Sequence, residues 1–488
     1  IQPHGVILVL TKGDYQIAQI SESILNFTGK NCEFFLGKDF RHFLSKQETE
    51  EVLARLSTGQ ENKTYFEITL VIEEREVLFS AIIHPKPMFL LLELEPVDKD
   101  TFSSFNRIYQ QVKTVMSQIS DSKNVLDLSN VAAREIKNIS GFDKVMIYRF
   151  DKDWNGEVIG EAKEEDMDSY LFLRFPASDI PRQARELYFK NPYRLIPDIH
   201  YQPSRLIPVI NPVINAFTDL SESNLRGVTN VHLEYLGNMI IIASMSVPII
   251  IENKLWGLIS CHHKIPNVLS HELRSAMELL AVSIGTKISS ISYNEQLQLK
   301  DKLSNGINSI VEKFYTGKGF DTLFDEQVDE IKTVFELSGL SLVMNGNIKA
   351  YGKCPSVSQI KDIVIWLQLH KIDEVYTSEN FPAIFAIAQE FKDTCSGILV
   401  IPLSSRKGDY ILGYKPEIVE TIKWGGNPNE AINFELDGKT YHPRNSFSIW
   451  KETVRFTSQP FYQAQKETAE RLRTALMECI IRDKYEVS

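Results

Sequence analysis

Two serines, Ser244 and Ser246, are the only hydroxyl-bearing residues in the otherwise apolar run from Met239 to Ile251. Residues two apart in a β-strand face the same side, so both hydroxyls would point from one face of this strand. They could line a pocket, or they could bond to neighbouring backbone groups. The residues just upstream favour the pocket.

The segment from Arg226 to Tyr235 brings four kinds of polar group together. It carries a cation at Arg226, a hydroxyl at Thr229, an imidazole at His232 and a phenol at Tyr235. Cofactors are held where a few polar groups converge between apolar walls. Together with the serines, this segment predicts a ligand-binding site.

The chain offers no comparable pattern for catalysis or for a metal ion. No Gly-rich phosphate loop follows a strand, and neither an HExxH pattern nor a nucleophile elbow occurs. The run Cys261-His262-His263 is the one cluster of metal-ligating types. Adjacent strand residues point to opposite faces, so at most Cys261 and His263 could share an ion, and no further ligand pair is evident. We therefore expect neither a catalytic residue nor a metal in this chain.

Bulk composition narrows the class of protein further. The 488 residues carry a net charge of −11 and are 43% hydrophobic and 24% charged, as in a globular chain of about three domains. Binding to a nucleic acid or an anionic membrane surface would require clustered Lys and Arg, so with this net negative charge we expect neither partner. No apolar run reaches the roughly 18 residues of a membrane span. The five cysteines are scattered without CxxC spacing, so we expect a cytoplasmic chain without disulfides.

The pattern of the chain changes near residue 101. Residues 1 to about 97 mix short apolar runs with turn signals, which is typical of a small α+β domain. Helical spacing from Phe102 to Ile119 and from Val125 to Ile136 then leads to a strand, Lys144 to Phe150. A second domain therefore begins close to residue 101.

The second domain should contain a long loop and a hairpin. Seven of the twenty prolines lie between Pro176 and Pro212, so this stretch is expected to be an ordered loop with one helix, Arg182 to Lys190. The runs Met239 to Ile251 and Lys254 to His263 predict two strands joined by a tight Glu252-Asn253 turn.

A long helix should link this domain to a third. Helical pattern without proline continues from Ser270 to about Tyr315, roughly 65 Å at 1.5 Å per residue. A helix of this length commonly joins domains or pairs with a partner helix. The third domain would occupy about 317 to 465. The charged helix Gln465 to Lys484 that follows is either a severed connector or a simple cap helix.

Six short motifs follow one another along the chain. They are Ile1-Gln-Pro-His-Gly5, Pro176-Ala-Ser-Asp-Ile-Pro181, His232-Leu-Glu-Tyr-Leu-Gly-Asn-Met239, Leu255-Trp-Gly-Leu-Ile-Ser-Cys-His-His263, Trp424-Gly-Gly426 and Pro443-Arg-Asn-Ser-Phe447. In this order and spacing they resemble the successive signatures of phytochromes. Each alone is weak, but together they span essentially the whole chain, which makes coincidence implausible.

The resemblance implies an α+β chain of three domains, each an antiparallel sheet with flanking helices. These are a PAS domain at 1–100, a bilin-binding GAF domain at 101–290 and a PHY domain at 291–488. The PHY domain would send a hairpin, the tongue at about 423–461, onto the GAF pocket and would end in a connector helix. In the family, the N-terminal segment threads a GAF loop as a figure-of-eight knot, a rare exception to un-knotted topology.

The resemblance also points to a chromophore. Plant and cyanobacterial members attach a bilin through a Cys immediately before the pocket histidine, where this chain has Val231. Bacterial members attach biliverdin through a Cys upstream of the Ile-Gln-Pro-His-Gly motif, with which this sequence starts. A bacterial phytochrome with biliverdin is therefore expected, its anchoring Cys lying upstream of Ile1. None of the five cysteines sits where the family needs one.

Site residues follow from the same resemblance. The two propionates of a linear tetrapyrrole would meet Arg194 and Arg226, helped by Ser244 and Ser246. Its positively charged pyrrole N–H groups would meet the backbone carbonyl of Asp179, a water and His232. Strand periodicity leaves His262 and His263 open as donors to the outer-ring carbonyl, and the family pattern chooses His262. The remaining bilin contacts, including the walls around the rotating ring, are expected to be Tyr148, Tyr170, Phe175, Ile180, Thr229 and Tyr235.

A switch is implied as well. Asp179 resembles the aspartate that pairs with the tongue arginine, here Arg444, in the red-absorbing state. Isomerisation about the C15=C16 bond breaks that pair in the family, and Ser446 becomes the partner as the tongue refolds toward a helix. A step of two residues keeps the face of a strand but moves about 200° round a helix, so the exchange requires a change of backbone type. Trp424 and Trp450 would repack at the base of the tongue.

The expected function is therefore red/far-red light sensing coupled to an output module outside this chain. Histidine kinase is the commonest output in the family and would signal to a response regulator. A parallel homodimer through GAF and PHY helices is expected from the family, although no strict heptad occurs. One alternative is a GAF protein that binds another small ligand such as a cyclic nucleotide, which leaves the tongue motif unexplained. The other is an enzyme whose catalytic part lies downstream.

Overall fold

The computed structural model divides the chain into two compact units, which are described separately. It describes residues 1–58, 63–73, 75–97, 104–315, 319–430, 432–434 and 441–486. The first unit is formed by Ile1–Ile291 with Lys423–Trp450, and the second by Ser292–Ile422 with Lys451–Ser488. Within the described ranges, no helix combines the length and apolar character needed to cross a membrane.

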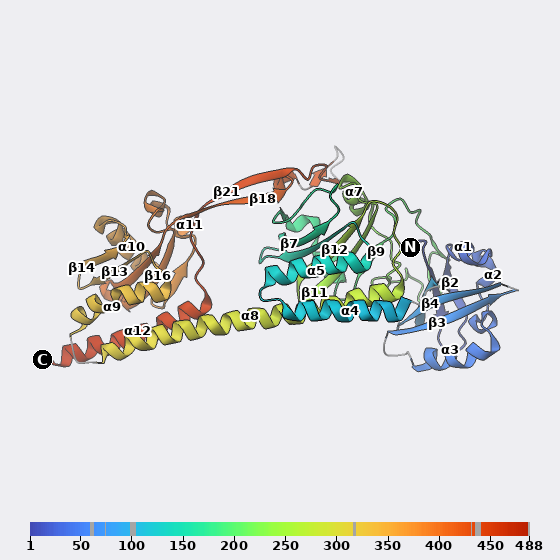
Figure 1. Ribbon diagram of the computed structural model, residues 1–488, viewed down its shortest axis with the longest axis horizontal. Helices are drawn as coiled ribbons and strands as arrows, with labels where there is room; N and C mark the ends of the chain where they lie inside the picture. Colours follow the sequence, from blue (N-terminus) through green and yellow to red (C-terminus); the bar gives the residue numbers. More distant parts are fainter. Residues whose placement is uncertain are drawn as a thin grey trace. The chain divides into compact units, whose positions relative to one another are not determined.

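An antiparallel sheet made mostly from residues 1–97 begins the first unit (Figure 1). Its strands, in spatial order, are β10 (Leu206–Ile207), β2 (Ile17–Ser21), β1 (Val6–Thr11), β5 (Phe89–Pro96), β4 (Arg75–Pro85) and β3 (Thr64–Ile72). Short helices α1 (Ile24–Thr28) and α2 (Cys32–Phe35) and the longer α3 (Lys46–Thr58) accompany them. Alternate residues of β1, β3 and β4 enter one apolar core, as period-2 strands require.

Six antiparallel strands of a second sheet lie in the same unit. They pair in the order β8 (Arg174–Phe175), β7 (Gly156–Lys163), β6 (Lys144–Phe150), β12 (Lys254–His263), β11 (Ala243–Ile251) and β9 (Arg194–Ile196), and two strands described below extend the sheet beyond β8. Glu252 and Asn253 join β11 to β12 with φ of 49° and 59°, as the tight hairpin turn requires. The expected hairpin is therefore confirmed.

The two faces of this second sheet have different chemistry. Val145, Ile147, Met245, Ile259 and Cys261 face one way and share a core with the helices below. Those helices are α4 (Ser104–Asp121), α5 (Val125–Ser140) and the first part of α8 (His271–Phe314) (Figure 1). The opposite face is covered by the 164–242 segment, including α6 (Arg182–Leu187) and α7 (Asn230–Asn238). This opposite face carries the polar residues that the sequence singled out.

The N-terminal residues lie inside the excursion between β8 and α7. Ile1 exchanges two backbone hydrogen bonds with Ser204, and the backbone N–H of Gln2 donates to Leu225 O. The Gln2 side-chain amide donates to Leu195 O at 3.0 Å. In addition, β10 of this excursion extends the first sheet through β2. These contacts agree with an N-terminal segment passing through a loop of the second domain, while the knot itself stays a prediction.

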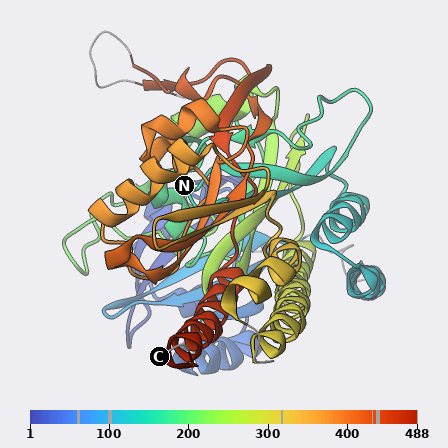
Figure 2. The ribbon, with the colours of Figure 1, turned by 90° about the vertical axis from the view of Figure 1, so that its left-hand side faces the viewer.

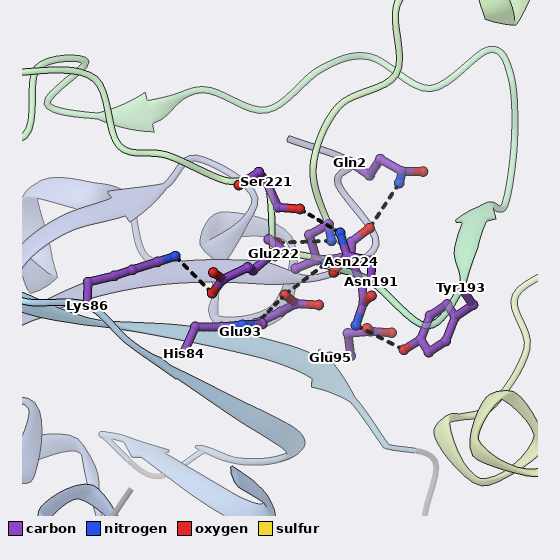
Figure 3. A network of polar contacts seen from close by, with 12 residues as sticks. Gln2, His84, Lys86, Glu93, Glu95, Asn191, Tyr193, Ser221, Glu222 and Asn224 are labelled. Carbon is purple, nitrogen blue, oxygen red and sulfur yellow. Dashed lines mark hydrogen bonds and ion pairs between the residues drawn. The ribbon is translucent and has the colours of Figure 1, made fainter. Parts of the chain in front are cut away.

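A buried polar network fastens the excursion to the first sheet (Figure 3). Glu93 of β5 accepts from His84 at 3.2 Å and from the Asn224 backbone N–H at 3.1 Å. The carboxylate of Glu95 meets both terminal nitrogens of Arg274 from α8, at 2.8 and 2.6 Å. Buried charges need partners of opposite charge or hydrogen-bond donors, so this network holds the two sheets in a fixed relative position.

The second unit contains a sheet between two helical layers. The strand order is β14 (Asn347–Gly352), β13 (Gly339–Met344), β17 (Asp409–Lys415), β16 (Gly397–Ser404) and β15 (Tyr376–Ser378). One face packs on the end of α8, α9 (Phe320–Phe335) and α12 (Gln463–Glu486), which lie side by side in Figure 2. The other face packs on α10 (Val357–Leu369) and α11 (Phe381–Ile384).

The described part of the tongue is extended. Its outer arms, β18 (Ile418–Gly425) and β21 (Ile449–Thr457), are neighbouring strands, and Trp424 of β18 pairs in parallel with Arg174 of β8. The inner strands β19 (Ile432–Phe434) and β20 (Tyr441–Pro443) pair antiparallel. Residues 431 and 435–440 of the expected tongue lie outside the described residues.

Several predicted boundaries were wrong in detail. The strand expected from Met239 begins only at Ala243, because α7 runs to Asn238 and Ile240 has a positive φ of 59°. The helix predicted over Arg182 to Lys190 ends at Leu187. The helix predicted to end at Ile136 continues to Ser140, where Gly141 caps it in the left-handed conformation. The helix predicted from Phe102 is described from Ser104, because 101–103 lie outside the described residues.

Candidate functional site

Two rows of side chains cross the polar face of the second sheet. Register places Ile196, Ser244, His262, Lys144 and Lys163 in one row, on five successive strands. The next row consists of Arg194, Ser246, Ser260, Met146 and Glu161. Residues directly opposite in antiparallel strands share a face. The prediction that Ser244 and Ser246 point the same way is therefore confirmed, and His262 lies with them.

The pairing also separates the two adjacent histidines. His262 faces the polar side, whereas His263 faces the helices together with Cys261. His263 Nδ1 lies 3.0 Å from Asp143 Oδ2 and accepts from the Asp143 backbone N–H. Within the described ranges, no three His, Cys, Asp or Glu side chains are arranged to hold a metal ion.

A deep cationic region lies at one end of the site. Arg194 donates to Gly227 O at 2.9 Å through Nη2, but its Nη1 is buried and has no partner in the part of the chain that the structure describes. Burial and the nearby charge of Arg226 lower the pKa of Arg194 to about 10. Burial also lowers the pKa of Arg226. A buried guanidinium with an unused donor, beside a second cation, is suited to an anionic group such as a carboxylate.

The two histidines of the site are both in their neutral forms at pH 7. Burial, followed by the charge of Arg194, lowers the pKa of His232 to about 4. Burial, with Lys144 and His232, lowers that of His262 to about 3. His232 still keeps part of its surface accessible, and His262 Nδ1 is buried without a hydrogen-bond partner among the described residues. The accessible part of His232 and the unpartnered nitrogen of His262 are therefore the groups that a ligand here would contact.

Aromatic side chains gather at the other end. Tyr148, Tyr170 and Phe175 are almost fully buried in one apolar cluster, with the rings of Tyr148 and Phe175 6.2 Å apart. Gly156 makes room for Tyr148, because an added Cβ would lie 1.6 Å from that ring. The rings of Tyr235 and His232 stack on α7 at 6.1 Å. Three of the predicted aromatic residues thus share one cluster, and Tyr235 and His232 form a stacked pair.

Asp179 joins this aromatic end to the tongue. Its Oδ2 accepts from Tyr235 Oη at 2.8 Å and forms an ion pair with Arg444 Nη2. The side chains of Asp179 and Arg444 are only 5% and 3% exposed. Burial raises the pKa of Asp179 more than Arg444 and Tyr235 lower it. The predicted pairing of Asp179 with Arg444 is confirmed, within the first unit.

Further contacts hold the tongue arginine. Arg444 Nη1 donates to Gly425 O at 2.7 Å, and the backbone oxygen of Arg444 accepts from Asn238 Nδ2 of α7 at 3.2 Å. Gly426 has φ +97°, and an added Cβ would lie 2.4 Å from Ser446 O. A side chain is therefore excluded there for two reasons.

The other predicted site residues lie at the margins. Ser446 is exposed, and its Oγ accepts from the Ser448 backbone N–H. Trp424 is buried and Trp450 is half-buried. Ile180 packs at the edge of the aromatic cluster. Thr229 is exposed and stands at the N-terminus of α7.

Several residues of the site had no role in the sequence interpretation. Tyr188 shares a hydrogen bond of 2.7 Å with Ser246, and Phe447 packs edge-on against Tyr235 at 5.2 Å. His442 of β20 pairs with Glu234 of α7 at 2.9 Å. Phe447 lies inside a recognised motif and could have been found there. Tyr188 gives no signal in the sequence, because only folding brings it to the serine.

Comparison with known proteins identifies the three parts of the chain. A model for the PAS fold matches residues 1–97, one for the GAF domain matches 124–288, and one for the phytochrome region, called PHY, matches 304–485. These ranges fall within the three domains expected from the sequence. The site therefore lies on the sheet of a GAF domain.

Similar proteins cover the whole chain. Cyanobacterial phytochrome B of Nostoc sp. is 35% identical and the bacteriophytochrome of Pseudomonas aeruginosa 33% identical over all of it, and the chain spans 65% and 66% of their lengths. The crystal structure of a bacteriophytochrome from the photosynthetic bacterium R. palustris aligns with a TM-score of 0.86 at 31% identity, covering 99% of this chain and 96% of that one. The Stigmatella aurantiaca phytochrome photosensory core module aligns at 0.84 and 32% identity, with the same coverage.

Fold and comparisons together define a chain of PAS, GAF and PHY domains, with the candidate site on the GAF sheet. The chain belongs to the phytochrome family, in which photoreceptors carry a linear tetrapyrrole chromophore.

Proposed function

We propose that this chain is the light-sensing part of a red/far-red photoreceptor and holds biliverdin on the polar face of its GAF sheet. When bound, the bilin would absorb red light and isomerise about its C15=C16 bond. Two buried nitrogens without a partner among the described residues support this: Arg194 Nη1 at the β9 end of the polar rows, and His262 Nδ1 two strands away on β12. The first is suited to the acidic side arms of a bilin, and the second to a ring carbonyl.

The chain's own residues divide the work of binding. Arg194 and Arg226 supply positive charge for the propionates, with Ser244 and Ser246 as additional donors. His232, neutral at pH 7, and the backbone oxygen of Asp179 can accept from pyrrole N–H groups. Tyr148, Tyr170, Phe175 and Tyr235 exclude water around the ring that turns, with Ile180 and Thr229 at the margin.

We expect covalent attachment to use a cysteine preceding Ile1. Val231 occupies the position immediately before His232. Cys261, although on the same sheet, is completely buried on the helix side. The other four cysteines lie in the flanking domains and form no disulfide within the described ranges.

The ion pair between Asp179 and Arg444 carries the proposal of a switch. It links the aromatic end of the pocket directly to the tongue through two nearly inaccessible side chains. Movement of the neighbouring ring would disturb Tyr235, which donates to the same carboxylate oxygen. Loss of the pair would free Arg444, and refolding of the tongue toward a helix would bring the exposed Ser446 to Asp179. Trp424 and Trp450 would repack during this change.

For the whole protein, we propose a cytoplasmic homodimer that signals through a further C-terminal module. Histidine kinase activity toward a response regulator is the expected output. This chain would contribute the light-dependent part and no catalysis of its own.

Absorption spectroscopy with biliverdin tests the proposal. We expect a red band on mixing and a reversible shift after red illumination. Asp179→Ala and Arg444→Ala should retain the band but lose stable photoconversion, whereas Arg149→Ala, which removes an exposed pair with Glu157, should behave as the unchanged chain. No band with biliverdin, together with binding of a cyclic nucleotide, would favour the other ligand class. Normal conversion in both switch variants would contradict the tongue mechanism.

A further inference from the structure

A buried lysine stands on the polar face without a role in the proposed function. Lys144, at the start of β6, is 1% exposed, and its cross-strand partner on β12 is His262. Because directly opposite residues share a face, the lysine side chain belongs to the wall of the site and not to the helix-side core. Lysine is rarely buried to this degree without a specific partner.

The ammonium group of Lys144 is held by one short segment, residues 168–170. Nζ lies 3.8 Å from the centre of the Tyr170 ring and donates to Asp168 O. The same segment is fixed from β7, since Glu161 accepts from the Tyr170 backbone N–H at 2.8 Å and from Ser169 Oγ. A cation over an aromatic face attracts the ring, by more when both are shielded from water. The position of Tyr170 therefore depends on a charge at Lys144.

The titratable groups around Lys144 come from three directions. Glu161 and Lys163 face it from β7 and Asp168 from the loop that follows, while the neutral His262 faces it from β12. Burial lowers the pKa of Lys144 to about 8, since Glu161 and Asp168 only partly offset the loss of hydration. The lysine thus remains charged at pH 7 but titrates only slightly above it.

We propose that Lys144 is a positioning residue of the pocket, whose ammonium group fixes Tyr170 and imposes a positive field on His262 at the outer-ring end. This rests on the proposed function, because Tyr170 and His262 are assigned to that end of the bilin. Lys144 itself acts through these two neighbours. Deprotonation releases Tyr170 and removes the field, so the outer-ring end of the pocket responds to pH.

Hydrogen exchange in the chain without bilin tests the first half. The readout is the protection factor of the Tyr170 amide, which is bonded to Glu161. This protection factor should fall roughly tenfold between pH 7 and 9.5 in the unchanged chain, because Lys144 loses its charge. It should be low at every pH in Lys144→Met, and high at every pH in Lys144→Arg because a guanidinium stays charged. Lys264→Met, which removes an exposed pair with Asp166, is the matched control and should behave as the unchanged chain.

Spectroscopy with biliverdin tests the second half. The red band of the unchanged chain should alter with a midpoint near pH 8, and this step should be absent from both Lys144→Met and Lys144→Arg. If Lys144→Met does not fold, comparison of the unchanged chain with Lys144→Arg still decides both readouts.

The failures are distinguishable. Absence of any red band would contradict the proposed function, and the role of Lys144 in holding Tyr170 would then be decided by hydrogen exchange alone. A red band without a pH step, together with equal Tyr170 protection in the unchanged chain and its Met variant, would overturn the role of Lys144 and leave the photoreceptor intact.

Discussion

The substitution Arg444→Met tests how strongly the tongue is held on the GAF domain. Methionine fills much of the arginine's volume but removes its charge and its donors to Asp179 and Gly425. Asp179 then remains nearly inaccessible with Tyr235 as its remaining described partner. Breaking a buried ion pair by removing one member costs about 3–5 kcal/mol. The ratio of docked to undocked tongue should therefore fall by roughly 100- to 5,000-fold.

The loss should depend on pH in a defined direction. Burial already raises the pKa of Asp179, and without the arginine that pKa rises further. A carboxyl group with a folded pKa above its unfolded value stabilises the folded form at low pH, and this contribution is lost as pH rises through the folded pKa. Docking in the variant should consequently be weakest at pH 8 and should recover toward pH 5.

Hydrogen exchange of the tongue measures this directly. The Gly426 amide, which donates to Ser448 O at 3.0 Å, reports on the closed hairpin. Its protection should drop in Arg444→Met and return partly at pH 5, while Arg149→Ala should change it by less than tenfold, since exposed pairs contribute about 0–1 kcal/mol. Equal protection at pH 8 in the variant and the unchanged chain would refute the view that this ion pair holds the tongue.

Three further expectations follow from particular contacts. Glu95→Gln should cost about 3–5 kcal/mol of unfolding free energy in urea, because it leaves Arg274 buried without its carboxylate, whereas the exposed Glu51→Gln should cost about 1 kcal/mol or less. Equal effects would contradict the buried pair between Glu95 and Arg274. Gly156→Ala should displace Tyr148, since the new Cβ would lie 1.6 Å from its ring, and should weaken the red band formed with biliverdin; an unaltered band would show that Tyr148 does not shape the pocket. His232 has a pKa of about 4 in the folded chain, against an ordinary value of 6.5, so its stabilising contribution is present above pH 6.5 and is lost toward pH 4. In urea titrations of the bilin-free chain, His232→Gln should reduce this change in unfolding free energy with pH by about 3 kcal/mol. The same pH dependence in the variant and the unchanged chain would exclude the assigned burial of His232.

The sequence predicted the strands of the site better than its loops. Apolar alternation and turn chemistry located β6, β12 and the Glu252-Asn253 hairpin, because these signals are local. The beginning of β11 was misplaced, since Ile240 to Ile242 are apolar and β-branched yet connect α7 to the strand. Apolar composition alone does not distinguish a buried connection from a strand.

Most residues of the site were predicted from motifs, whereas their pairing and the faces on which they lie depend on the tertiary structure. Asp179 and Arg444 lie 265 residues apart, so no local pattern joins them; only the family resemblance did. Register on the sheet then separated His262 from His263, a choice that periodicity had left open. The burial of Lys144 was not predicted, because a lysine at the start of a strand ordinarily reaches solvent. It is buried by the 164–170 segment, which folds over it and is distant from it in local pattern.

The shortness of β8 has a consequence for solubility during signalling. In the structure, this two-residue strand forms the rim of the GAF sheet proper and is met by the tongue at Trp424. Long bare rims of β-sheets invite pairing with other chains and lead to aggregation. A tongue that leaves β8 would expose this edge strand of only two residues, which is too short to pair stably with a strand of another chain. If the tongue withdraws as proposed, β8 would therefore add little exposed sheet edge for pairing with another chain.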